Sequence, residues 1–432
     1  MKKKMLCALA LCAALSAGAA PVPQFDAPAA SAAAADSFTD ASIHALPMMK
    51  RERRFLAGDE KGPLFLSRWT TVDFAGSGLG ALANALVDFS AKEDQDAEAA
   101  NAQITAEARQ ERDERLANGS PFYGPFDRIR DVYVCRADSR VVSLMESVSS
   151  YTGGVHGMYG VLGQTFDAQT GKKLALSDVC PNKDRLIAAI VAHLGFDYPN
   201  APFMQSGSTL VQEQVRQLVT DDVVPWTLGP QGLTVYFNPY VIGSYAEGIY
   251  TTTILFSQHP DLFAADYGVG PAAYAMELEP HHLVTRLSDS PRDHRLTVGG
   301  DENGITITFG GETITDSVVF KGMAIRPVVA QLADGRHYLY VDGFDNERGY
   351  RVIRVYDLNL PEPACIGVQP MTFLASPVEQ ENDRKWFVMT DPADFMAVSM
   401  EESALYPPGT QVRCRVGSDG RMEIISVADA KG

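Results

Sequence analysis

The chain has 432 residues, with 37 basic and 54 acidic side chains and a formal net charge of −17. A charge of this sign argues against nucleic acid and anionic lipid as partners, and it favours encounter with a cationic partner. Solubility alone is the simpler explanation of the charge.

The N-terminus has the pattern of an export signal. Lys2 to Lys4 form a positive region, Met5 to Leu15 an apolar segment too short to span a bilayer, and Ala17-Gly-Ala19 a cleavage site. We predict a signal peptide over residues 1–19, so the mature chain is expected in the periplasm, the cell envelope or the extracellular space. Because three lysines leave with the signal, the net charge falls from −17 to −20. No later stretch reaches the roughly 18 to 20 apolar residues of a membrane helix, so no membrane span is expected in the mature chain.

Four cysteines remain in the mature chain: Cys135, Cys180, Cys365 and Cys414. An even number in an exported chain permits disulfides, and four cysteines allow three connectivities. Proximity in the sequence favours Cys135 with Cys180 and Cys365 with Cys414. Four buried free thiols are the alternative, and no C-x-x-C spacing suggests a zinc site.

The chain divides into four parts after the signal. Residues 21–36 are mostly Ala, Pro and Ser, which predicts a tether over 20–45. An α+β domain is expected over 46–260, a proline-punctuated linker over 261–294 and an all-β domain over 295–432. The basic run from Lys50 to Arg54 is interpreted as a solvated segment that leads into the fold.

Strands and helices of the first domain are segregated along the chain, which indicates an α+β fold. A helix over 79–116 has one weak apolar stripe and is expected to end at Asn118-Gly119. Asn182 is a good N-cap for a helix that ends at Gly195. The other predicted elements are strands at 64–74, 129–135, 140–150, 155–166, 233–237 and 249–256 and a helix at 209–219.

Short β-branched and aromatic runs predict the strands of the second domain. These strands are 296–298, 305–309, 328–332, 338–342, 350–358, 411–416 and 422–427. They are too few for a closed propeller, so a sandwich or a small barrel is expected. Tyr338, Tyr340, Tyr350 and Tyr356 would form a glycan-binding platform in one interpretation, but aromatic cross-strand pairs that stabilise the sheet are favoured.

A glycine-dense stretch from Ser149 to Gly160 lies between two β-rich runs and contains one buried-looking histidine, His156. Glycine inside a strand suggests close backbone approach, either to a neighbouring strand or to a bound molecule. The stretch is therefore the centre of the candidate site.

Several motifs in order carry a family resemblance. They are Tyr151-Thr-Gly-Gly-Val-His-Gly157, Phe166-Asp-Ala-Gln-Thr-Gly171 with Leu176-Ser-Asp178, Val235-Tyr-Phe-Asn-Pro-Tyr240, and Ser244-Tyr-Ala-Glu-Gly248. Over residues 60 to 260 the chain resembles the extracytoplasmic domain of RsiV-type anti-sigma factors. A similar domain precedes the catalytic domain of PdaC-type peptidoglycan deacetylases.

The resemblance implies a small α+β domain that, in the anti-sigma factors, binds lysozyme through its loops. It implies a cell-wall role in the deacetylases. No membrane helix with a sigma-binding tail and no downstream deacetylase domain is recognised here, so lysozyme binding is expected by analogy only. The residues taken as ligand-binding are Tyr151, His156, Tyr159, Tyr240, Ser244, Tyr245 and Glu247.

Catalysis by His156 is the competing interpretation, with Asp138 or Glu247 as its carboxylate partner. A structural histidine held by backbone hydrogen bonds is favoured, because no nucleophile, G-x-S-x-G motif or metal cluster accompanies it. His281 and His282 follow two glutamates, but adjacent histidines in a strand point to opposite faces. No metal and no cofactor is expected.

These observations together predict a non-catalytic envelope protein that binds a lysozyme-type muramidase or peptidoglycan. The alternatives are a glycan-modifying enzyme that uses His156 and a purely structural surface protein.

Overall fold

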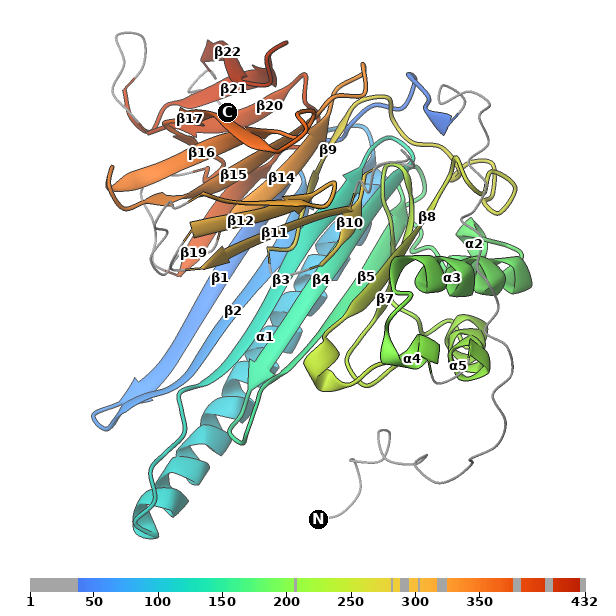
Figure 1. Cartoon of the computed structure of the whole chain (residues 1–432). Helices are drawn as coiled ribbons and strands as arrows, with labels where there is room; N and C mark the ends of the chain where they lie inside the picture. The colour runs from blue at the N-terminus through green and yellow to red at the C-terminus, as the bar shows by residue number, and fades with distance from the viewer. Residues whose placement is uncertain are drawn as a thin grey trace.

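The computed structural model describes residues 38–205, 208–280, 283–287, 295–301, 304–316, 325–375, 382–400 and 407–427. Within these ranges the chain forms five β-sheets and a smaller set of helices, so the structure is mixed and dominated by strands (Figure 1). The expected α+β class agrees at this level. None of the sheets formed by these residues closes into a barrel.

The largest sheet has six strands in the order β19-β1-β2-β3-β4-β5. Neighbours are antiparallel except β2 and β3, which run parallel because the long helix α1 joins them. Figure 1 shows α1 lying along one face of this sheet. The bounds are β1 Met48–Asp59, β2 Gly62–Phe74, α1 Gly80–Ala117, β3 Phe126–Ala137, β4 Val141–Tyr151, β5 Met158–Asp167 and β19 Asp383–Val388.

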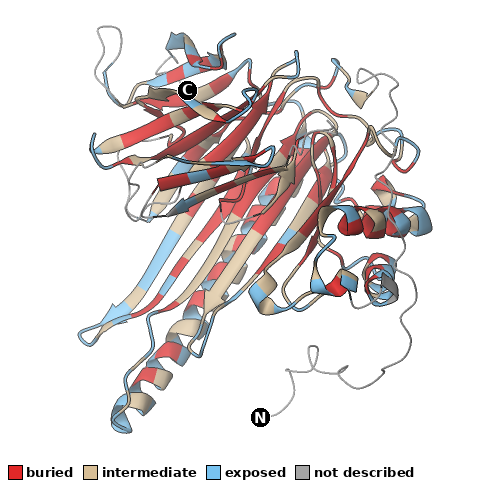
Figure 2. Cartoon of the chain, viewed as in Figure 1, coloured by how far each residue is buried: buried red, intermediate tan, exposed pale blue. Residues whose placement is uncertain are grey.

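Helix α1 confirms the predicted helix and its weak apolar stripe. Its buried face starts with Leu82 and Leu86, packed on the sheet, and continues with polar residues such as Glu93 and Arg112. Figure 2 shows this buried stripe along a helix whose far end is exposed. The helix ends at Asn118, followed by a glycine with φ of 70°, as the sequence predicts. None of the described helices is long and apolar enough to cross a membrane.

A three-stranded sheet, β6-β7-β8, packs with helices α3 and α5 around a second apolar core. Asn182 caps α3 as predicted, because its Oδ1 accepts a hydrogen bond from the backbone N–H of Arg185 at 3.1 Å. The bounds are α2 Leu176–Val179, α3 Lys183–Asp197, α4 Pro202–Gln205, α5 Ser208–Thr220, β6 Trp226–Leu228, β7 Gly232–Phe237, the 3-10 turn η2 Tyr245–Glu247 and β8 Tyr250–Leu255.

Three further sheets, β10-β11-β12-β13, β17-β16-β15-β14-β9 and β18-β20-β21-β22, hold most of the C-terminal strands. Tyr338, Tyr340 and Tyr356 are 2%, 0% and 0% exposed, so they stabilise the sheet and form no glycan platform. The bounds are β9 Tyr274–Glu277, β10 Thr285–Arg286, β11 Arg295–Asp301, β12 Gly304–Phe309, β13 Glu312–Asp316, β14 Arg326–Gln331, β15 His337–Asp345, β16 Tyr350–Asp357, β17 Ala364–Gln369, β18 Met371–Thr372, β20 Phe395–Ser399, β21 Gln411–Val416 and β22 Met422–Val427.

The predicted boundaries at 260 and 295 do not separate these sheets. The predicted linker over 261–294 contains β9 and β10, each hydrogen-bonded within a C-terminal sheet. Conversely, β19 of the predicted second domain pairs with β1 of the first. In the described part of 261–294, proline and glycine therefore lie between paired strands.

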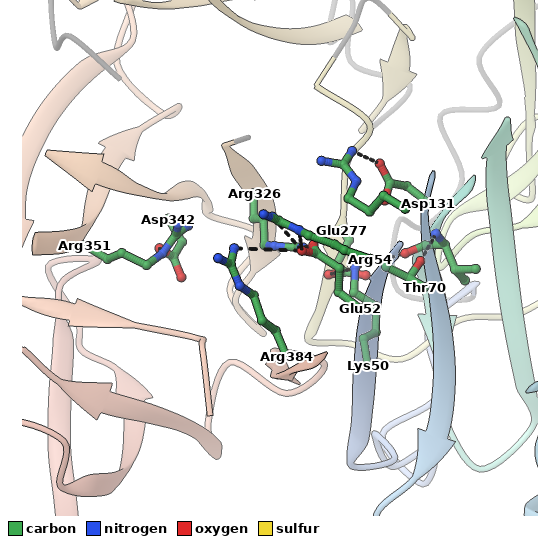
Figure 3. A network of polar contacts seen from close by, with 12 residues as sticks. Lys50, Glu52, Arg54, Thr70, Asp131, Glu277, Arg326, Asp342, Arg351 and Arg384 are labelled. Atoms are coloured by element: carbon green, nitrogen blue, oxygen red, sulfur yellow. Dashed lines mark hydrogen bonds and ion pairs between the residues drawn. The ribbon is translucent and has the colours of Figure 1, made fainter. Parts of the chain in front are cut away.

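The basic run from Lys50 to Arg54 is part of a paired strand and not a solvated segment that leads into the fold, which corrects the sequence interpretation, although Arg54 at its end is exposed. It lies in β1 between β2 and β19, where Lys50 is 1% and Glu52 2% exposed. Lys50 Nζ contacts Glu277 Oε1 at 2.6 Å, and Glu52 Oε2 contacts Arg326 at 2.6 Å (Figure 3). The run thus joins distant parts of the chain through buried ion pairs.

Part of the predicted tether is also folded. Residues 1–37, which include the predicted signal peptide, lie outside the described residues. From residue 38 onward the chain packs on the protein: Thr39 bridges to Gly270, and Ile43 is 5% exposed. The apolar side chains of Phe38 and Ile43 contribute to this packing.

All four cysteines are free thiols, so neither favoured disulfide pair is present. Cys180 belongs to the core around α3, whereas Cys135 packs against a different cluster beside Tyr133. Cys414 is buried in a C-terminal core and Cys365 is exposed. The cysteines that are close in sequence therefore do not lie close together in the fold. Burial raises the pKa of the Cys180 thiol to about 12, so this thiol stays protonated at neutral pH.

Candidate functional site

The candidate site forms where two loops meet. One loop joins β4 to β5 and contains Gly153 and Gly154, whose φ values of 88° and 105° suit glycine. The other runs from 238 to 249 and joins β7 to β8. Asn238 fixes the second loop to β5: its Oδ1 accepts from the N–H of Val161 at 2.8 Å, and its Nδ2 donates to the carbonyl of Val161 at 3.1 Å.

Four aromatic side chains cluster at this junction, and we call them the aromatic patch: His156, Tyr159, Tyr240 and Tyr245. The Tyr245 ring is at the centre, stacked on His156 at 4.1 Å and edge-on to Tyr159 at 5.2 Å between ring centroids. The Tyr240 ring lies 5.8 Å away. The Tyr245 hydroxyl donates to the carbonyl of Gly157 at 2.7 Å, so the patch also links the two loops.

Ser244 and Glu247 act as braces of this patch. Glu247 closes the η2 turn, because its Oε2 accepts from the backbone N–H of Ser244 at 2.6 Å. Its Oε1 accepts from the Tyr250 hydroxyl at 2.9 Å. Hydrogen bonds from the backbone and side chain of Ser244, then from Tyr250, lower the pKa of Glu247, which is therefore ionised at neutral pH.

His156 is exposed, and this corrects the expectation of a buried histidine. It lies in the turn beyond the ends of β4 and β5, where its Nδ1 is 2.8 Å from the carbonyl oxygen of Gly157. Asp138 is engaged elsewhere: it is 1% exposed and pairs with Arg136 at 2.6 Å. Among the contacts of the described residues, no carboxylate reaches the His156 ring.

Tyr151 lies at the base of the first loop rather than in the patch. Its hydroxyl donates to the carbonyl of Gly154 at 3.2 Å, and its ring packs edge-on against Phe126. Sequence reasoning missed Asn238 and the exposed apolar side chains next to His156, namely Val155 at 99% and Met158 at 54% exposure. A Pro-flanked Asn after a strand was a detectable signal for Asn238.

Removing the Asn238 side chain should release the second loop from β5. Asn238→Ala loses two hydrogen bonds to Val161, so the free energy of unfolding is expected to fall by roughly 1 to 3 kcal/mol. Urea unfolding measures the loss, and hydrogen exchange measures protection in residues 238–248. Asn359→Ala is the matched control, because Asn359 makes the same pair of bonds to the backbone of His337. Equal exchange in the two variants would contradict the assignment.

Comparison with known proteins finds a family match for one part of this site. Residues 209–257 match the model of the DUF3298 family, described as a protein of unknown function. This segment covers α5, the three-stranded sheet and the loop that carries Tyr240, Ser244, Tyr245 and Glu247. The other half of the patch, His156 and Tyr159, lies outside the matched residues.

Two solved DUF3298-family structures are similar to this chain. One is from Bacteroides fragilis NCTC 9343, with 17% identity, a TM-score of 0.41, and 52% of this chain and 95% of that chain covered. The other is from Pseudomonas aeruginosa PAO1, with 16% identity, a TM-score of 0.32, and 52% and 97% covered. None of the curated proteins matches the chain.

Proposed function

We propose that this protein is an exported, non-catalytic binding protein of the cell envelope, whose aromatic patch binds a lysozyme-type muramidase or peptidoglycan. The observation that carries the proposal is the convergence of His156 and Tyr159 with Tyr240 and Tyr245 at one surface. His156, Tyr240 and Tyr245 come from the motifs that resemble the lysozyme-binding domain of RsiV-type anti-sigma factors, and Tyr159 follows the first of these motifs by two residues.

The chemistry of the patch supports binding more than catalysis. Aromatic rings that are held by hydrogen bonds lose little conformational entropy when a partner covers them. Tyr240 is 61% exposed, which leaves its ring available to a partner. The net charge of −17 favours a cationic partner, and this preference supports a muramidase over a neutral glycan.

Calorimetric titration of the mature chain with a muramidase, and separately with soluble peptidoglycan fragments, tests the proposal. Saturable binding that weakens with salt is expected for the muramidase. Tyr240→Ala is expected to weaken that binding about 30-fold, the effect of losing an aromatic hot spot. Tyr350→Ala, a half-buried tyrosine of β16 in a C-terminal sheet, is the control and should leave the affinity unchanged. The absence of heat with either ligand would overturn the proposal.

The enzymatic alternative is tested with His156→Ala. A binding protein should keep its fold and still bind its partner with reduced affinity, because the three tyrosines of the patch remain in contact with one another. An enzyme that uses His156 as a base should instead lose turnover of peptidoglycan by a factor of about 100 to 10,000. Release of products by the unaltered chain, abolished by this substitution, would favour the enzyme.

A further inference from the structure

A cavity of about 730 Å³ opens between the segment 209–257 and the C-terminal strands. It lies at the opposite end of the β7–β8 hairpin from the aromatic patch: Gln231 precedes β7 and Ser257 follows β8, whereas Tyr240 follows β7. β7 has six residues, which separates the two regions by roughly 20 Å. The cavity is therefore a second candidate site, distinct from the patch, and its volume falls in the range of small-molecule sites.

The polar walls of the cavity are held in place by hydrogen bonds. Gln231 Nε2 donates to Gln331 Oε1 at 2.5 Å and to the Tyr274 hydroxyl at 3.1 Å. Among the described contacts both amide hydrogens of Gln231 are thus used, while its Oε1 keeps acceptor capacity. Asn359 clamps His337, accepting from its N–H at 2.9 Å and donating to its carbonyl at 3.0 Å.

The N-terminal segment closes one side of the same cavity. Phe38 lines it, and the carbonyl of Phe38 accepts from the N–H of Gly270 at 3.0 Å. Gly270 in turn lies against the carbonyl of Pro230, where an added Cβ would come within 1.7 Å of the oxygen. The walls therefore come from segments far apart in sequence, and Gly270 packs closely against Pro230.

Apolar and polar groups share the lining. Leu255, Phe256, Phe309 and Leu358 are buried apolar residues, and Gln231 and Gln331 line the same space. Among the described lining residues there is no Lys or Arg, and Glu312 is an exposed carboxylate. This composition disfavours an anionic ligand and suits an uncharged one with an apolar face.

We propose that the cavity binds an uncharged small molecule that carries secondary amide groups and an apolar face. An amide N–H of the ligand finds its acceptor in Gln231 Oε1, and the methyl or ring carbons pack on Phe256 and Phe309. N-acetylated sugars and short neutral peptides share this chemistry. The site is independent of the proposed function, which concerns the aromatic patch.

Titration calorimetry of the whole mature chain tests the proposal with named probes. N,N′,N″-triacetylchitotriose and N-acetyl-alanyl-alanine amide represent the two sources of the amide, and saturable binding of one of them is expected. Cellotriose has the sugar rings without acetamido groups, and N-acetylglucosamine 6-phosphate adds negative charge. Both are expected to bind at least about tenfold more weakly, the effect of a lost or mismatched hydrogen bond.

Variants locate the binding. Gln231→Met keeps the length of the side chain but removes its amide, so the affinity for the better amide probe should fall about tenfold. Leu360→Trp enlarges a side chain of the lining that is 42% exposed, and should block the probe without disturbing the buried core. Tyr240→Ala should leave this binding unchanged while weakening any muramidase binding, so failure of either proposal is distinguishable. The inference would be overturned if neither amide probe bound, or if cellotriose bound as tightly as the amide probes. It would also be overturned if Gln231→Met and Leu360→Trp both kept full affinity.

Discussion

Replacing Glu52 by alanine is expected to lower the free energy of unfolding by about 3 to 5 kcal/mol, the usual cost of leaving buried charges without their partner. Glu52 is 2% exposed and lies among arginines. Its Oε2 contacts Arg326 at 2.6 Å, and its Oε1 contacts Arg54 at 2.8 Å (Figure 3). Removing the carboxylate leaves positive groups that repel one another at the junction of β1 and the C-terminal strands.

Arg326, which pairs with Glu52, also contacts the aromatic ring of Trp386. The Arg326 guanidinium lies 3.9 Å from the centroid of Trp386, and Arg351 lies 4.9 Å from the same ring. Trp386 sits on β19 opposite Lys50 of β1. Loss of Glu52 therefore affects several neighbouring charged groups and not a single ion pair. The contact of Arg326 with the Trp386 ring remains, and it limits the loss of free energy of unfolding.

Urea unfolding of the variant against the unaltered chain measures the effect. Asp394→Ala is the control, because Asp394 pairs with Arg413 on the surface, where both side chains are about half exposed. Such a pair contributes at most about 1 kcal/mol. Equal losses in the two variants would show that burial of the Glu52 array does not matter.

The pH dependence of the Glu52 effect follows from its pKa. Burial alone would raise the pKa, but Arg326, Arg68 and Arg54 lower it to about 2, from a usual value of 4.5. The stabilisation is therefore complete above about pH 4.5 and is lost as the pH falls towards 2. The difference between the unaltered chain and Glu52→Ala should narrow between pH 5 and pH 2.5, and a constant difference would contradict the assignment.

The charged residues around Glu52 also show which parts of the fold could be predicted from the sequence. Local periodicity predicted the helix that became α1 and the hairpin of β21 and β22, because each depends on neighbouring residues. Strand β1 was missed, because its buried residues Lys50 and Glu52 are charged and find their partners far along the chain. Arg326 is 274 residues from Glu52, and no local pattern records that distance.

The candidate site was predictable for a different reason. Tyr240, Ser244, Tyr245 and Glu247 came from motifs in a resemblance, and the structure places all four with His156 at one loop junction. Glycine density pointed to the neighbouring stretch. The cavity beside Gln231 was not predictable, because its walls come from seven separate segments whose residues are ordinary in composition.

The glycine-dense stretch predicted close backbone approach to a neighbouring strand or to a bound molecule. At two glycines the neighbour is the protein itself. A Cβ at Gly157 would lie 2.8 Å from the carbonyl oxygen of Ser150, and one at Gly163, just beyond the stretch, would lie 1.8 Å from the carbonyl oxygen of Trp226. The second contact joins β5 of the six-stranded sheet to β6 of the three-stranded sheet.

Gly163→Ala is therefore expected to lower the free energy of unfolding by about 3 kcal/mol or more, at or above the upper end of the usual cost of overpacking. The clash is with backbone atoms of Trp226, which have no rotamer to adopt, so β5 and β6 must move apart. That movement also weakens the hydrogen bond from the N–H of Leu228 to Ser143 Oγ, now 2.9 Å, which ties the two sheets together.

The same displacement should reach the aromatic patch, because Tyr159 lies on β5 and Tyr245 follows β7. Gly163→Ala is expected to reduce muramidase binding together with stability, measured by calorimetry and by urea unfolding. Gly229→Ala is the matched control, since a Cβ at Gly229 meets only the carbonyl oxygen of Gly232 at an ordinary 3.5 Å. If Gly163→Ala unfolds at the same urea concentration as Gly229→Ala, the two sheets are not held at this contact. If stability falls but binding of the folded fraction persists, the patch is fixed by Asn238 and Tyr245 alone.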